Sequence, residues 1–145
     1  MDYDSNNPFA RILRGELPSV KVYEDEHTLA IMDIMPQADG HVLVLPKESA
    51  AELFTLSDDS AAACIRTTKK VAAAVKAAMG APGIMVAQFN GPAAGQTVPH
   101  VHFHIVPREH AAPLRPHASA PADSGELQRT AARIIAALDA AGASS

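Results

Sequence analysis

The chain has little of several features on which whole classes of protein depend. Cys64 is the only cysteine among 145 residues, so an internal disulfide and a cysteine-based zinc cluster are both excluded. No apolar run approaches the roughly 20 residues that a membrane-spanning helix needs. The acidic, polar N-terminus is unlike a signal peptide. We therefore expect a reducing compartment, by default the cytoplasm, and no membrane partner.

The chain also has little net charge. Its 12 basic and 16 acidic residues give a formal charge of −4 with histidine neutral. This balance offers no general attraction for nucleic acid, so an anionic substrate would have to be held by a local group of residues. Hydrophobic residues make up 48% of the chain, enough to build the core of one compact domain.

Glycine, proline and polar residues divide the chain into short segments. Strand-like composition is found over residues 20–23, 28–33, 41–45, 83–90 and 101–106. Helices are predicted from Pro8 to Gly15, from Ser57 to Gly80, and over residues 127–141. Because the strands follow in hairpin-like order around one long helix, the pattern predicts an α+β domain with an antiparallel sheet of about five strands.

The composition changes after residue 110. We divide the chain into a domain over residues 1–110, a Pro- and Ala-rich linker over 111–125 and a helical tail over 126–145. In the long helix, apolar residues at helical spacing are Ile65, Ala72, Val75 and Met79, and in the tail they are Leu127, Ala131, Ile134 and Leu138. The stripe in the tail needs a surface to cover, either on the domain or on a partner. Cys64 is expected to be a small core residue.

Three of the seven histidines alternate along one predicted strand. Side chains of His100, His102 and His104 should point to one side, with the apolar residues between them facing the long helix. Such a triplet can be the polar face of an edge strand, a set of zinc ligands, or a nucleophilic imidazole assisted by its neighbours. The remaining histidines expected at the surface are His27, His110 and His117.

The segment before the triplet distinguishes these alternatives. Residues 90–99 are rich in small residues, which let backbone N–H groups approach an anion closely. Asn90, Gln96 and Thr97 add side-chain donors. Donors beside uncharged imidazoles suit a phosphate ester better than a divalent metal, so the segment favours the nucleophile.

Residues 90–108 resemble the histidine triad (HIT) family, whose mark is His-x-His-x-His followed by two apolar residues, here Ile105 and Val106. The preceding Ala-Ala-Gly-Gln is similar to the bacterial Hint-like branch. The resemblance continues upstream, over residues 9–18, 23–25, 30–33 and 36–46. It implies a HIT-like fold and a homodimer whose sheets join across the interface. From the residues alone, a small sheet with open edges would benefit from pairing.

The resemblance implies catalytic roles for five residues. His102 would be the nucleophile that forms a covalent nucleotidyl-histidine, and His104 would polarise a phosphate oxygen. His100 would orient its neighbours, while His41 would join the proton network. Thr97 would pass a proton to the leaving group. Without the resemblance, His41 is an ordinary histidine at a strand start and Thr97 a loop hydroxyl.

The resemblance also implies a nucleotide site. Asp33 would accept hydrogen bonds from both ribose hydroxyls, and Asn90 and Gln96 would contact phosphate oxygens. Without the family, Asn90 is a turn residue before a glycine. The other residues expected to contact the nucleotide are Phe9, Ile12, Ile31, Ile34, Gly95 and Val98, of which the apolar ones are equally ordinary core residues.

The chain departs from the family at a metal site. Many bacterial relatives bind structural zinc, but Asn7, Ala10 and Ser49 stand at three of the four ligand positions, leaving only His100. One ligand cannot hold zinc, so we predict neither zinc there nor any other cofactor.

The expected function is hydrolysis of nucleoside phosphoramidates or related nucleotides, with a purine nucleoside monophosphate as product. The family's nucleotidyl transferases carry glutamine at the last triad position. His104 therefore favours water as the acceptor. Three alternatives stay open: a dinucleoside polyphosphate hydrolase using the same attack, a non-catalytic nucleotide-binding scaffold dimer, and a metal-dependent hydrolase.

Overall fold

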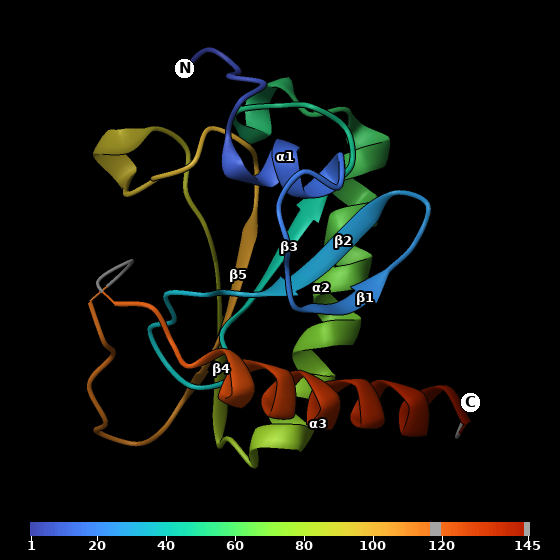
Figure 1. The fold of residues 1–145 in the computed structure, drawn as a ribbon, viewed down its shortest axis with the longest axis vertical. Coiled ribbons are helices and arrows are strands. Elements are labelled where there is room, and N and C mark those ends of the chain that lie inside the picture. Colours follow the sequence, from blue (N-terminus) through green and yellow to red (C-terminus); the bar gives the residue numbers. More distant parts are fainter. Residues whose placement is uncertain (117–119, 144–145) are drawn as a thin grey trace.

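The computed structural model describes residues 1–116 and 120–143, and Figure 1 shows their arrangement. His117 and parts of the predicted linker and tail lie outside the described residues. Along the chain the elements are α1 (Pro8–Leu13), β1 (Lys21–Glu24), β2 (Thr28–Met32), β3 (Val42–Pro46), the 3₁₀ turn η1 (Leu53–Thr55), α2 (Asp58–Met79), β4 (Gly83–Gln88), the 3₁₀ turn η2 (Pro92–Ala94), β5 (Phe103–Arg108) and α3 (Ser124–Ala143).

The strands within the described residues form one five-stranded antiparallel sheet in the order β1-β2-β3-β5-β4. Asp25 closes the tight β1–β2 connection. Its carboxylate accepts hydrogen bonds from the backbone N–H groups of His27 and Thr28 and from the Thr28 hydroxyl. Burial opposes ionisation, but these hydrogen bonds outweigh it and lower the pKa of Asp25 to about 2. The α+β fold with its antiparallel sheet is confirmed.

The two faces of the sheet carry separate apolar layers. Because side chains alternate along a strand, β2 and β3 are buried on both faces. Ala30, Met32, Val42 and Val44 pack with α2 and α3, whereas Leu29, Ile31, Leu43 and Leu45 pack with Phe9 of α1. The sheet is therefore the middle of three layers, with α2 and α3 on one face and α1 on the other.

Helix α2 begins and ends where its capping residues predict. The Ser57 hydroxyl accepts a hydrogen bond from the Ser60 N–H, and Gly80 adopts the left-handed conformation with φ of 60°. The predicted apolar face is wrong at Ile65, whose side chain is 53% exposed. Ile65 follows the fully buried Cys64 and is turned about 100° away from it around the helix. Burial raises the pKa of Cys64 to about 12, which keeps it a protonated core thiol.

The tail helix covers the domain itself. Leu127, Ala131 and Ile134 of α3 are buried in the same core as α2, and the Arg133 guanidinium donates to the carbonyl of Ala78 near the end of α2. Figure 1 shows α3 crossing α2 at that end. The apolar stripe predicted in the tail therefore packs against the domain of the same chain. None of the helices in the described ranges has the length and apolar character needed to cross a membrane.

The last strand lies two residues later than predicted. β5 spans Phe103–Arg108, so Pro107 lies inside the strand instead of ending it. β5 pairs with β3 only as far as Ile105, and Pro107 lies opposite Ile84 of β4. The missing N–H of Pro107 therefore breaks no hydrogen bond to β3.

Candidate active site

The three histidines lie around the start of β5 but do not share one pocket. His104 is in the strand, His102 lies just before it, and His100 is in the preceding bend. The apolar residues between them, Val101 and Phe103, are buried in the core with α2, as the alternation predicts. His102 and His104 line one cavity, with ring centroids 4.9 Å apart. His100 lies behind them, fully buried.

This histidine cavity has a volume of about 430 Å³ and lies on the α1 face of the sheet. Most of its wall is apolar. The residues that line it are Pro8, Phe9, Ile12, Leu17, Pro18, Ser19, Ile31, Met32, Asp33, Ile34, Met35, Leu43, Thr97, Val98, His102 and His104. An apolar cavity with a few convergent polar groups is the usual form of a small-molecule site.

The backbone fixes the proton position on His102. Its Nδ1 lies 2.7 Å from the carbonyl oxygen of His100. A carbonyl can only accept, so Nδ1 carries the proton and neutral His102 has its lone pair on Nε2. The ring is 5% exposed, and Phe9 contacts it edge-on with centroids 4.9 Å apart. His102 therefore has the tautomer that a nucleophilic Nε2 requires.

A second backbone group fixes the pair His41 and His104. The N–H of Gln37 donates to His41 Nδ1 at 3.1 Å, so neutral His41 carries its proton on Nε2. This Nε2 lies 3.0 Å from His104 Nδ1 and 3.4 Å from Asp33 Oδ2. His41 thus donates to His104, whose own proton is then on Nε2. Both rings are almost completely buried, which strengthens these interactions.

The same geometry opposes metal binding. Among the described residues, Asp33, His41 and His104 bring ligand atoms within 4.8 Å of one another. Because Gln37 occupies Nδ1 of His41, the Nε2 atom that would face a metal carries the proton. The donor set of these three residues fits a proton relay better than a cation.

Asn7 and His100, two of the four residues at the zinc positions that the resemblance implies, have hydrogen-bond partners within the protein. The Asn7 side chain caps α1 by accepting from the Ala10 N–H at 2.9 Å. His100 Nε2 lies 2.9 Å from the Pro46 carbonyl oxygen, and His100 Nδ1 lies 2.7 Å from the Tyr3 hydroxyl. Burial lowers the pKa of His100, although the hydrogen bond to Pro46 opposes this shift. These residues do not fit zinc.

Most of the predicted nucleotide-contacting residues reach the histidine cavity, as does Thr97, which was predicted to pass a proton. The nucleotide-contacting residues that line it are Phe9, Ile12, Ile31, Asp33, Ile34 and Val98. Asp33 has one carboxylate oxygen anchored by the Met35 N–H at 2.8 Å. The structure therefore brings an acidic group, apolar side chains and two imidazoles to one wall.

Three predicted residues have other contacts. The Gln96 side chain accepts from the Gly91 N–H and donates to the carbonyls of Ala51 and Val98. Asn90 accepts from the Leu53 N–H and exchanges hydrogen bonds with the Gln88 amide. Gly95 ends η2 with φ of 102°, a conformation that favours glycine. Among the described residues that line the histidine cavity, Asn90, Gly95 and Gln96 are absent, and their phosphate contacts stay predictions.

Sequence reasoning missed three groups that hold the imidazoles. Two are backbone groups, the N–H of Gln37 and the carbonyl of Pro46, and backbone groups leave no signal in residue type. The third is Tyr3, which lies in a polar N-terminal segment 97 positions from His100. No periodicity or motif connects residues so distant.

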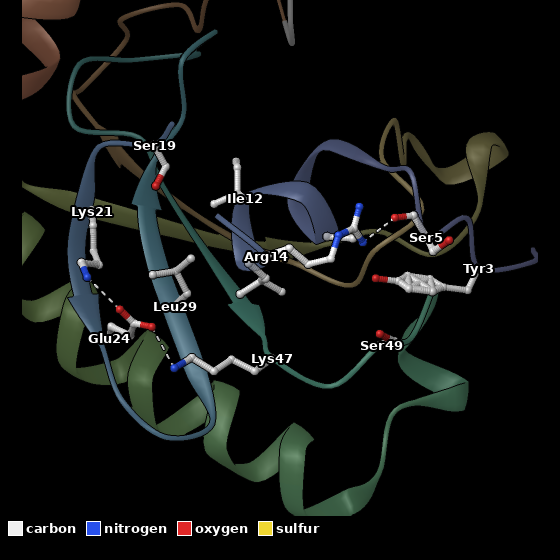
Figure 2. A pocket seen from close by; sticks show the side chains of 12 residues that line it. Tyr3, Ser5, Ile12, Arg14, Ser19, Lys21, Glu24, Leu29, Lys47 and Ser49 are labelled. Atoms are coloured by element: carbon white, nitrogen blue, oxygen red, sulfur yellow. Dashed lines mark hydrogen bonds and ion pairs between the residues drawn. The ribbon is translucent and has the colours of Figure 1, made fainter. Parts of the chain in front are cut away.

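A second, larger cavity of about 660 Å³ lies beside the first and shares Ile12 and Ser19 with it. Figure 2 shows its charged residues. Glu24 pairs with Lys21 at 2.7 Å and with Lys47 at 2.8 Å, while the Arg14 guanidinium donates to the carbonyl of Ser5 at 2.7 Å. Its cations thus have partners within the protein.

Comparison with known proteins gives three kinds of match. The HIT domain model matches residues 14–111. Adenosine 5'-monophosphoramidase hnt1 of Schizosaccharomyces pombe is 45% identical over 100 residues, which are 69% of this chain and 72% of that protein.

Two solved structures share the fold. The crystal structure of a Hit-like protein involved in cell-cycle regulation from Bartonella henselae, with unknown ligand, is 44% identical with a TM-score of 0.89, covering 94% of this chain and 99% of that chain. A Zn-bound histidine triad family protein from Mycobacterium smegmatis is 31% identical with a TM-score of 0.82, covering 94% and 96%.

Proposed function

Because the chain belongs to the HIT domain family, we propose that it is a nucleotide hydrolase that breaks the bond between the α-phosphorus and the leaving group of nucleoside phosphoramidates. The name of the fission-yeast relative, adenosine 5'-monophosphoramidase, supports this substrate class. The observation that carries the proposal is the His102 geometry: a buried ring at the cavity wall whose Nδ1 is bonded to the His100 carbonyl.

In the proposed first step, the Nε2 lone pair of His102 attacks phosphorus. A bond between phosphorus and Nε2 forms as the bond between phosphorus and the amine nitrogen breaks. The ring becomes positively charged, and its Nδ1–H stays bonded to the His100 carbonyl, which stabilises that charge. The amine must leave protonated, and we assign Thr97 at the cavity wall to relaying that proton, which the Thr97 hydroxyl receives from solvent water as it donates its own.

In the second step, water attacks the nucleotidyl-histidine. The bond between phosphorus and the water oxygen forms as the bond between phosphorus and Nε2 breaks, the attacking water releases one proton to solvent, and the nucleoside monophosphate leaves with His102 in its neutral form. We propose that the Nε2–H of His104 donates a hydrogen bond to a phosphate oxygen of the substrate. His41 supports that role because its own Nε2–H is directed to His104 Nδ1.

The rest of the cavity suits a nucleoside. Asp33 lies at the wall with one carboxylate oxygen anchored by the Met35 N–H and the other 3.4 Å from His41 Nε2, and we assign this carboxylate to accepting from the ribose hydroxyls. Phe9, Ile12 and Ile31 offer an apolar surface to a purine base. The preference for a purine and the cytoplasmic location stay predictions.

We further propose that the protein is a homodimer formed through β4. The sheet has two edges, and the residues of β1 include the charged Lys21 and Glu24. β4 carries no charged residue, and its Val86 is 49% exposed. An uncharged, apolar sheet edge favours pairing with a second strand. The β4 strand of a second copy, related by a two-fold axis, would pair with this open edge.

The test uses adenosine 5'-phosphoramidate in excess EDTA. We expect turnover by the wild type, at least a 1,000-fold lower kcat for His102→Ala, and unchanged kcat for His110→Ala, a matched variant at an exposed histidine. Loss of wild-type activity in EDTA would indicate metal chemistry. Binding of adenosine monophosphate without turnover would indicate a scaffold. Faster cleavage of a dinucleoside polyphosphate would indicate that this compound is the preferred substrate of the same mechanism.

A further inference from the structure

Tyr3 lies outside the segment matched by the HIT domain model, yet its side chain contacts the first histidine of the triplet. The Tyr3 hydroxyl is 2.7 Å from His100 Nδ1, and the two ring centroids are 5.5 Å apart. His100 is fully buried, so this hydroxyl reaches it from the N-terminal segment that lies over it.

The segment around Tyr3 is fixed at several points. The N-terminal amino group forms an ion pair with Glu52 at 2.9 Å. The carbonyl of Ser5 accepts from Arg14, and the carbonyl of Asp4 accepts from the Asn7 N–H. Figure 2 shows Tyr3 beside Ser5 at the wall of the larger cavity, with the bond from Arg14 to Ser5 drawn as a dashed line. The position of Tyr3 is therefore defined by contacts on both sides.

The hydrogen bonds of His100 have only one consistent direction. The carbonyl of Pro46 accepts from Nε2, so Nε2 carries the proton of the neutral ring. Nδ1 is then an acceptor, and the Tyr3 hydroxyl is the donor. The carbonyl oxygen of the same His100 accepts from His102 Nδ1. Tyr3 is thus connected to the imidazole of His102 through His100, whose ring accepts from Tyr3 and whose carbonyl accepts from His102.

We propose that Tyr3 is a positioning residue for His102: by holding the His100 ring it fixes the carbonyl that orients the His102 imidazole and keeps its lone pair on Nε2. The catalytic consequence rests on the proposed function, whereas the structural link does not.

Removal of the Tyr3 hydroxyl leaves a buried ring nitrogen without its donor. The His100 ring then turns or changes its protonation to find another partner, and its peptide carbonyl moves with it. A small displacement of the nucleophile lowers the rate of attack strongly. Substrate binding should change little because Tyr3, which lines the larger cavity, is not among the described residues that line the histidine cavity.

The test compares Tyr3→Phe with Tyr23→Phe. Tyr23 is the other tyrosine of the chain and is a matched control, because its hydroxyl also has a side-chain partner, Asp25 at 3.0 Å. Two measurements are made on the full chain. One is kcat and KM with adenosine 5'-phosphoramidate, and the other is the ¹⁵N NMR spectrum of the histidine rings, which reports the protonated nitrogen of each.

We expect Tyr3→Phe to lower kcat about tenfold with KM within about twofold, and to alter the His100 and His102 ring signals. Tyr23→Phe should alter neither. An unchanged kcat together with unchanged His102 signals in Tyr3→Phe would overturn the inference while leaving the proposed function intact.

If the wild type does not turn over the substrate, the proposed function fails and the NMR measurement decides the inference alone. Altered His102 signals in Tyr3→Phe but not in Tyr23→Phe support the link from Tyr3 to His102, and unaltered signals refute it. A lower melting temperature of Tyr3→Phe with unchanged kcat and ring signals would assign Tyr3 a purely structural role and contradict the proposal.

Discussion

The two cavities beside α1 share Ile12 and Ser19 but differ in how their polar groups are held. The larger one has Arg14, Lys21, Glu24 and Lys47 in its wall, and these charges have partners on the protein surface. The smaller one is mostly apolar. The His100 carbonyl sets the proton position on its His102, and His41, itself fixed by the Gln37 N–H, sets that on its His104. Solvent screens the exposed pairs, whereas burial strengthens the few polar interactions of the smaller cavity. The difference indicates that chemistry here depends on fixed proton positions in an apolar setting and not on the amount of charge.

Removal of His41 should produce the largest effect of the following changes. In His41→Ala the Nδ1 of His104 loses its donor, so the proton on His104 is no longer confined to Nε2. We expect kcat for adenosine 5'-phosphoramidate to fall about 100-fold, with a similar KM. His27→Ala, at an exposed histidine, is the control. A fall of less than about threefold would mean that the fixed tautomers of the smaller cavity are unimportant.

Asp33→Asn should weaken recognition of ribose. A carboxylate accepts from two hydroxyls, whereas an amide offers one acceptor oxygen, so kcat/KM for the ribonucleoside substrate should fall about tenfold. The 2'-deoxy substrate should lose much less. The ratio of the two kcat/KM values isolates the ribose contact from the neighbouring His41. An unchanged ratio would remove Asp33 from ribose binding.

His100, which is buried behind the smaller cavity, should also make the stability of the protein depend on pH. Burial lowers the pKa of His100 below its ordinary value of 6.5. At a pH between the pKa of His100 in the folded chain and 6.5, its value in the unfolded chain, the unfolded chain binds a proton that the folded chain excludes. The free energy of unfolding therefore decreases as the pH falls through 6.5, and the contribution of His100 to stability is fully present above it. Thermal melts at a series of pH values should show this decrease in the wild type and a shallower one in His100→Gln. Equal slopes would contradict the assignment to His100.

The smallest effect is expected in the larger cavity. Glu24→Gln removes the partner of Lys21 and Lys47, but all three groups are substantially exposed. The free energy of unfolding should therefore change by at most about 1 kcal/mol, and kcat should stay within about twofold of the wild type. A tenfold change in kcat would show that the two cavities act together.

Residue patterns predicted the fold better than the detail of the site. The caps at Ser57 and Gly80, the α+β class and the alternation around His102 follow from local geometry, and all are confirmed. Helical spacing did not determine the rotation of α2 closely enough to place Ile65, since a shift of one residue turns a side chain by about 100°. Similarly, proline composition did not reveal that β5 lacks a β3 partner at Pro107.

Within the site, residue type indicated the chemistry but not the direction of each side chain. His102, His104 and Asp33 reach the cavity as their motif predicts. Gln96 has the same donors whether it contacts a phosphate or the carbonyls of Ala51 and Val98, so only coordinates distinguish these arrangements. The contact between Tyr3 and His100 depends on tertiary packing over 97 positions, which no local pattern encodes.

The central claim is that His102 Nε2 becomes covalently bonded to phosphorus during turnover. It is tested by mixing the wild type with an adenosine phosphoramidate, quenching in alkali within one turnover, and locating the adenylyl group by peptide mass spectrometry. We expect one adenylyl group on the peptide that contains His102, and its loss in His102→Ala. Turnover without any adenylylated peptide, or the adenylyl group on another residue, would show that His102 is not the nucleophile.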